Sequence, residues 1–398
     1  MRRHWDNCIA NFDAEVDEFV ADYFADPSRR VLLVAAAGFD PRSRRISRML
    51  ADTLGDRLSA IYIREERPGA SDALLTRADE NEAELRATVP ASEVVRVDVF
   101  ADDGAPVGGS RIVSRLGAHP VPDEVTDVIL DLSALSIGIG FPAARMLLED
   151  CEAAGGRSFH LMIVSNPEMD GRISSIPSTS VGAVKGFSPL VEQEEDGVAQ
   201  VWIPQLAPGR TTSLTRIGAA IGRCYKICPL LPFPARDPRR ADDLLSEYRT
   251  ALVDEWEVDP RDVVYASERN PLDSYRTLST LKTRFDRTMR GTYEPRMVLS
   301  PIGSKVLAAG ALMAAIEHDM AVQYLETESY LFDPAAEAGA GPDDMTVHLI
   351  LSGPIYDGYA DAAPDGAGAD EPADAWTEGD RDEGAGDAGG AAAAEVRA

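Results

Sequence analysis

An α/β fold with mostly parallel sheets is the class that the sequence predicts, and three observations lead to it. Short apolar runs, such as residues 30–37 and 127–132, have the length and composition of buried strands. Most of these runs end in a turn rich in Gly, Ser, Pro or Asp, and a segment of helical period follows. The same alternation begins again near residue 198. Strands that alternate with helices in this way form parallel sheets from strand–helix–strand units.

The first predicted module spans residues 28–168 and follows a helical lead-in at residues 1–27, where apolar residues recur at helical spacing. Gly108, Gly109 and Ser110 are expected in a loop. The strands of this module are expected at 30–37, 58–63, 94–99, 127–132 and 159–164, and its helices at 44–54, 73–88 and about 141–154.

A second module is predicted at residues 198–356, after a linker at 169–197 that is rich in Gly, Ser, Pro and acidic residues. Pro229 lacks an amide donor, so residues 225–231 are expected as an edge strand or an irregular segment. Both modules begin with a strand, a turn carrying Arg and hydroxyl groups, and a helix, and both are expected to be Rossmann-like. The strands are expected at 201–206, 263–266, 296–299, 321–325 and 347–351, and the helices at 214–222, 237–256, about 274–285 and 306–317.

Charge and composition restrict the partners of the chain. It has 67 acidic and 39 basic residues, a net charge of −28, and only four of the basic residues are lysine. Either a salt-loaded cytoplasm or a GC-rich genome accounts for this composition. The negative field disfavours non-specific binding to nucleic acid. Residues 357–398 contain almost no large apolar side chains, and they are expected to be a disordered acidic tail.

Other features favour a reduced, cytoplasmic protein. The four cysteines have no metal-binding spacing, and no metal site is predicted. No apolar stretch reaches the ~20 residues that span a bilayer, and the charged N-terminus does not resemble a signal peptide. The sequence leaves a homodimer open.

The turn Gly303-Ser304-Lys305 is the sharpest candidate site. Ligands of parallel α/β sheets bind beyond the carboxyl ends of the strands, and this turn joins a predicted strand to a helix. Gly303 allows close approach of the backbone, Ser304 offers a hydrogen bond, and Lys305 adds charge at a helix start that attracts anions. The spaced first glycine of a P-loop is missing. The alternative is an ordinary turn with a surface lysine.

Two further turns show the same logic. In the first, Asp40 either caps the next helix, a structural role that needs no ligand, or belongs to a ligand site. Arg42 in the first helical turn is unfavourable unless it meets an anion or an acid. The second turn again places a glycine, an arginine and hydroxyl groups before a helix. The candidate ligand-binding residues of the two turns are Gly38, Asp40, Arg42, Ser43, Gly209, Arg210 and Thr211.

Four other polar residues follow predicted strands. Asp131 and Ser133 either orient a sugar hydroxyl, a metal or a loop, or form a structural helix cap. Glu268 and Asp273 are weak candidates for a general base, because isolated acids in so acidic a chain are usually solvated. The histidines have no metal spacing, and the sequence identifies no cofactor.

Two segments resemble a known family. The strand–Gly-Ser-Lys–helix pattern at 299–316 and the Gly/Ser-rich strand end at 131–141 resemble the Rossmann-like ligand-sensing domains of CRISPR-associated proteins, the CARF family. Those domains often carry a Gly-Thr-Lys-like turn, and Gly303, Ser304 and Lys305 carry the likeness here. The resemblance covers two short loops and implies binding of a cyclic oligonucleotide at strand-end loops.

Three functions follow as hypotheses. The first is binding or sensing of a nucleotide or another phosphate-bearing ligand at the strand-end loops. The second is an enzyme, a transferase or hydrolase, that acts on a phosphorylated or nucleotide substrate, with Glu268 or Asp273 as base and Lys305, Arg42 and Arg210 as an electrostatic clamp. The third is a non-catalytic interaction subunit whose turns are empty.

Overall fold

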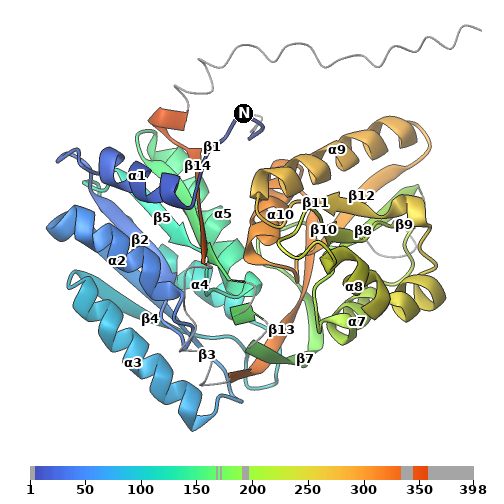
Figure 1. Ribbon diagram of the computed structural model, residues 1–398, viewed down its shortest axis with the longest axis horizontal. Coiled ribbons are helices and arrows are strands. Elements are labelled where there is room, and N and C mark those ends of the chain that lie inside the picture. The colour runs from blue at the N-terminus through green and yellow to red at the C-terminus, as the bar shows by residue number, and fades with distance from the viewer. Residues whose placement is uncertain (1–4, 167–168, 171–172, 191–196, 333–343, 357–398) are drawn as a thin grey trace, which may run out of the picture. The chain divides into compact units, whose positions relative to one another are not determined.

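The computed structural model describes residues 5–166, 169–170, 173–190, 197–332 and 344–356 (Figure 1). The predicted tail at 357–398 therefore lies outside the described residues. The structure confirms the α/β class with mostly parallel strands. No helix within the described ranges has the length and apolar character needed to cross a bilayer.

The first sheet has, within the described ranges, seven strands in the order β1-β14-β6-β5-β2-β3-β4. Five of them run parallel, in the order β6-β5-β2-β3-β4, whereas β14 is antiparallel to both of its neighbours, β6 and the edge strand β1. The bounds are β1 (Ile9–Phe12), β2 (Val31–Ala36), β3 (Leu58–Glu66), β4 (Ser92–Asp98), β5 (Asp127–Asp131), β6 (Ser158–Ser165) and β14 (Met345–Ser352). The parallel strands have the Rossmann order, in which the chain reverses direction across the sheet between β2 and β5.

Helices cover both faces of this sheet (Figure 1). The amphipathic helices α1 (Ala14–Tyr23), α2 (Ser43–Leu54) and α3 (Asp72–Thr88) bury one apolar stripe each against one face. The helices α4 (Gly108–Gly117) and α5 (Ile137–Ala154) pack on the other face. This second core continues into α9 (Pro271–Met289) and α10 (Lys305–Glu317), so it joins the two sheets.

The second sheet is smaller. Its strands lie in the order β7-β13-β12-β8-β9, and all except β7 are parallel. In chain order the parallel strands read 2-1-3-4, with the reversal between β8 and β12. The bounds are β7 (Ile173–Ala183), β8 (Val198–Pro204), β9 (Lys226–Ile227), β12 (Glu294–Ser300) and β13 (Ala321–Phe332), with a separate parallel pair β10 (Leu230–Pro232) and β11 (Val264–Ala266), and helices α7 (Thr211–Ile221) and α8 (Arg240–Glu247).

Several expected elements differ from those observed. The lead-in contains the strand β1 before α1, and the strand expected at 347–351 in the second module is β14 of the first sheet. Both errors have one cause: β1 pairs with β14 across more than 300 residues, and local periodicity does not report such a partner. The division into two domains at 169–197 stays a prediction, although β7 lies within that predicted linker.

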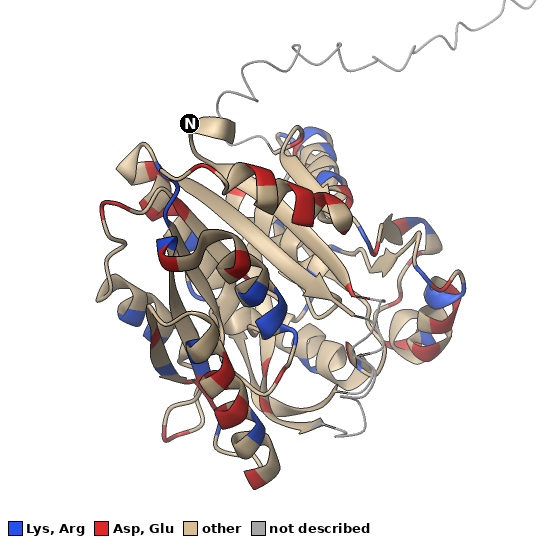
Figure 2. Ribbon diagram, turned by 60° about the vertical axis from the view of Figure 1, so that its left-hand side comes forward, with Lys and Arg blue, Asp and Glu red and all other residues tan. Residues whose placement is uncertain are grey.

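Helix boundaries also differ. The expected loop around Gly108 is the start of α4, because Ile112 and Leu116, four residues apart, bury one helical stripe and override the poor helix propensity of glycine. The long helix expected at 237–256 is instead α8 followed by a π-helical turn, Ala251–Glu255. Acidic and basic residues both occur along the outer helices (Figure 2).

Candidate functional site

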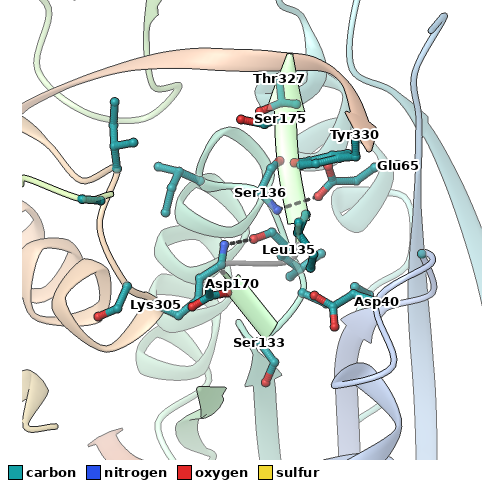
Figure 3. A pocket seen from close by; sticks show the side chains of 18 of the residues that line it. Asp40, Glu65, Ser133, Leu135, Ser136, Asp170, Ser175, Lys305, Thr327 and Tyr330 are labelled. Carbon is teal, nitrogen blue, oxygen red and sulfur yellow. Dashed lines mark hydrogen bonds between the residues drawn. The ribbon is translucent and has the colours of Figure 1, made fainter. Parts of the chain in front are cut away.

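A cavity of about 450 Å³ lies beyond the carboxyl ends of the strands of both sheets. Its walls include the segments after β2 and β5, where the first sheet reverses its strand order, and those after β8 and β12, where the second does. Such reversal points are where neighbouring loops diverge and leave a crevice for a ligand. The cavity has the volume of a small-molecule site. Figure 3 shows part of its lining, with Lys305 on one side and Asp40, Glu65 and Tyr330 on the other.

Three cations reach the cavity from the second sheet. Arg210 precedes α7, Arg240 begins α8, and Lys305 begins α10 directly after its cap Ser304. Among the described residues, the side chains of Arg210 and Arg240 have no hydrogen-bond or ion-pair partner, and the Nε atom of Arg240 is buried. Buried polar groups are nearly always paired, so the buried Nε atom of Arg240 is a donor that an anion in the cavity can use.

Lys305 is held differently. Its Nζ atom donates a hydrogen bond to the carbonyl oxygen of Leu135 at the end of the first sheet (Figure 3), and it makes no ion pair with a described carboxylate. Burial lowers the pKa of Lys305 to about 8, although the carboxylate of Glu65 acts in the opposite direction. The amine is therefore partly neutral near pH 8, and a bound anion would favour its charged form.

The cations of the first sheet are already neutralised. The Nη2 atom of Arg42 lies 2.6 Å from Oδ2 of Asp40, and its Nη1 atom lies 2.7 Å from Oδ1 of Asp170. Burial opposes the charge of Arg42, but the two carboxylates outweigh it and raise the pKa of the guanidinium above its usual value. Arg42 therefore meets two acids, one of the two kinds of partner expected for it, and forms an internal ion-pair cluster at the edge of the cavity.

A second cluster connects the two sheets. Arg67 pairs with Glu65 at 2.6 Å and with Glu326 of β13 at 3.6 Å, and Glu65 also accepts the amide hydrogen of Ser136 at 2.7 Å. Burial raises the pKa of Glu326 to about 7, although Arg67 opposes this. Gly138 makes room for this carboxylate, since a Cβ atom there would lie 1.6 Å from Oε1 of Glu326.

Asp131 lies behind the cavity wall. It is buried and accepts hydrogen bonds from the amide and hydroxyl of Ser133, while its Oδ2 atom has no partner among the described residues. Burial raises the pKa of Asp131 to about 7 against the effect of these hydrogen bonds. Ser133 does not cap α5, whose N-cap is Ser136, and its hydroxyl oxygen instead accepts the amide hydrogen of Val164 in β6. No trio of His, Cys, Asp or Glu in the described part of the chain is placed to hold a metal ion.

The structure brings most of the candidate residues together. Eight of the ligand-binding candidates line the cavity: Gly38, Asp40, Arg42, Ser133, Arg210, Gly303, Ser304 and Lys305. Glu268 also lines it. The others do not, and each has a local partner: Ser43 donates to the carbonyl of Asp40, Asp131 accepts from Ser133, Gly209 and Thr211 donate to Glu247, and Asp273 accepts from the amide of Ser267.

Six charged lining residues escaped the sequence analysis: Arg64, Glu65, Glu66, Arg67, Asp170 and Arg240. The strand expected at 58–63 continues as β3 to Glu66, so the carboxyl end of this strand and the turn after it were misplaced. The Arg64-Glu65-Glu66-Arg67 run was itself a signal, because four charges in a row at a strand end mark where the strand leaves the core. Arg240 gave no such signal within its polar helix.

Comparisons with known proteins indicate little beyond fold. No protein-family model and no curated protein sequence matches the chain. Solved structures similar to it include TrmN from Thermus thermophilus, at 14% identity over 43% of this chain and a TM-score of 0.22. Another is the human methyltransferase 10 domain containing protein, at 12% identity over 41% of this chain and a TM-score of 0.20. The chain spans 44% of the length of the first and 72% of the second.

Proposed function

We propose that the cavity binds a nucleotide or another small phosphate-bearing ligand. The observation that carries the proposal is the pair Arg210 and Arg240, which face the cavity without a partner among the described residues of a chain whose net charge is −28. Unlike the unpaired arginines on the exposed surface, these two line a cavity, and the Nε atom of Arg240 is buried there. A cavity that keeps two arginines and a lysine unneutralised is therefore suited to an anion that comes from outside.

Helix geometry supports the same ligand class. The starts of α5, α7 and α10 all contribute lining residues, namely Ser136, Arg210 and Ser304. Free amide groups and the helix dipole make such ends favourable for phosphate oxygens. The hydroxyl of Ser136 is buried without a partner among the described residues, so it is available to a ligand. A cyclic oligonucleotide, which the CARF resemblance implies, belongs to the same class.

A thermal-shift screen tests the proposal. Inorganic tripolyphosphate, ATP, GTP, CTP, UTP and cyclic di-AMP are added separately, with EDTA, at fixed KCl. At least one should raise the melting temperature, because a ligand at 100-fold excess over Kd stabilises by about 2.7 kcal/mol. Turnover of the same compounds distinguishes the enzyme alternative, for which Glu268 is the remaining candidate base. No stabilisation by any compound at millimolar concentration would favour the interaction-subunit alternative.

A further inference from the structure

We propose that the ligand is a nucleotide bound in one orientation, with its phosphates on Arg210, Arg240 and Lys305 and its base against the aromatic pair Phe39 and Tyr330. This inference rests on the proposed function and adds a second subsite, which the sequence analysis did not identify. Phe39 follows β2 in the first sheet, whereas Tyr330 lies near the end of β13. Both line the cavity.

The strand β13 sets the length of the cavity. Tyr324, Thr327 and Tyr330 of this strand all line it. Six residues of extended strand span roughly 20 Å, and the register shifts on either side of Thr327 shorten this to on the order of 15–20 Å. A ligand that lies along this strand is therefore elongated, as a nucleoside polyphosphate or a dinucleotide is.

Tyr330 lies at the aromatic end, and Tyr324 lies between the two groups of cations. Burial raises the pKa of Tyr324 well above its usual value, and the positive charges of Arg67 and Arg210 both act against this rise. At the aromatic end the ring centroids of Phe39 and Tyr330 are 5.2 Å apart, and the guanidinium carbon of Arg67 lies 5.3 Å from the Tyr330 centroid. Leu74, Leu75 and Ala78 of α3 add apolar walls.

Charge decides the orientation. At the aromatic end Arg67 and Arg42 are already paired with carboxylates, among them Glu65 and Asp40, so a phosphate there would meet negative charge. At the other end Arg210 and Arg240 are unpaired among the described residues. Aromatic rings and apolar walls bind the flat face of a base, and such stacking tolerates different bases. The phosphate group therefore belongs with the second sheet and the base with the first.

Calorimetry with two kinds of probe tests this. Inorganic tripolyphosphate reports the phosphate subsite alone, and ATP, GTP, CTP and UTP report both subsites, all with EDTA at fixed KCl. For the parent protein the tightest nucleotide should bind about 5- to 150-fold more tightly than tripolyphosphate, the usual range for one stacked base. Tyr330→Ala should remove most of this advantage and leave tripolyphosphate affinity unchanged, whereas Tyr330→Phe should keep it.

One control variant and one further subsite variant accompany the test. Tyr265→Ala removes an exposed tyrosine outside the cavity and should change neither affinity. Phe39→Ala is a second variant of the subsite, with the same expected result, and decides the matter if Tyr330→Ala folds poorly. Tripolyphosphate binding without any nucleotide advantage would overturn the base subsite and leave the proposed function standing. Equal weakening of both probes would overturn the subsite too, and no binding of any probe would overturn both proposals.

Discussion

Arg210→Ala is expected to weaken tripolyphosphate binding by about 10- to 150-fold while the unliganded protein melts at the same temperature or slightly higher. A hydrogen bond to a charged group contributes about 1.5–3 kcal/mol, which corresponds to that range of affinity. Stability should hold because the Arg210 side chain has no partner to lose among the described residues, and a cation before the first turn of α7 opposes the helix dipole. Titration calorimetry and a melting curve measure the two quantities.

Two matched variants sharpen this result. Arg261→Ala removes an exposed arginine that pairs only with Asp259 among the described residues, outside the cavity, and its effect on affinity should be less than 2-fold, roughly the scatter of surface substitutions. Lys305→Ala should weaken binding as Arg210→Ala does, but it should also lower the melting temperature, since the Leu135 carbonyl loses its donor. Unchanged tripolyphosphate affinity in both Arg210→Ala and Lys305→Ala would contradict the anion site.

Gly310→Ala is expected to destabilise the fold by about 2 kcal/mol, the upper end of the usual cost of overpacking less the helix propensity gained with alanine. A Cβ atom at this position of α10 would lie 2.3 Å from the carbonyl oxygen of Pro271 and 2.8 Å from the amide nitrogen of Tyr275. Both are backbone atoms of α9, so a side-chain rotation does not relieve the clash and the two helices must separate. Overpacking of a core usually costs about 1–3 kcal/mol, and the helix propensity gained with alanine, about 1 kcal/mol, does not offset it.

Gly303→Ala is the control for that loss. The atom nearest to its Cβ would be Oε1 of Gln205 at 3.5 Å, an ordinary contact, so the melting temperature should change little. Packing within the described residues therefore does not require a glycine at position 303, and its predicted role in the close approach of a ligand stays a prediction. Denaturant unfolding of the two variants beside the parent measures the difference, and an equal loss in both would show that the close approach of α9 to α10 is not what Gly310 permits.

The sequence predicted the parallel core and much of the cavity for one physical reason. Apolar runs such as 30–37 and 127–132 mark buried strands, and parallel strands place their following turns at a common edge. Gly303, Ser304 and Lys305 therefore meet Arg42 and Ser133 in space, as the strand-end rule implies. The central strands are also in register, with Val31 opposite both Leu58 and Asp127, so their carboxyl ends lie at one edge of the sheet.

Residues whose position depends on partners far away in the sequence were not predicted. The strand β14 is fully buried and apolar, but its pattern does not distinguish the sheet it joins. Tyr330 reaches the cavity because β13 extends to Phe332, seven residues beyond the apolar segment that ends at Leu325. Pairing with β7 across the sheet holds this polar extension in place. Such cross-strand partners lie far away in the sequence, and a local pattern does not report them.

Selective labelling by pyridoxal 5′-phosphate is the measurement that tests the anion site most directly. This reagent carries both a phosphate and an aldehyde, and a neutral lysine amine adds to the aldehyde and loses water to form an imine, which borohydride reduces to a stable product. The four lysines of the chain are Lys185, Lys226, Lys282 and Lys305, so peptide mapping resolves each one. Lys185 is exposed, whereas Lys226 and Lys282 pair with Asp262 and Asp286.

The account predicts that Lys305 is labelled first. Its labelling should rise between pH 7 and 9, because an amine with a pKa of about 8 changes from mostly charged to mostly neutral over that range. Excess tripolyphosphate should suppress the labelling of Lys305 alone, and Arg210→Ala should slow it by weakening the hold on the reagent phosphate. Preferential labelling of the exposed Lys185, or labelling of Lys305 that tripolyphosphate does not suppress, would contradict a phosphate site in this cavity.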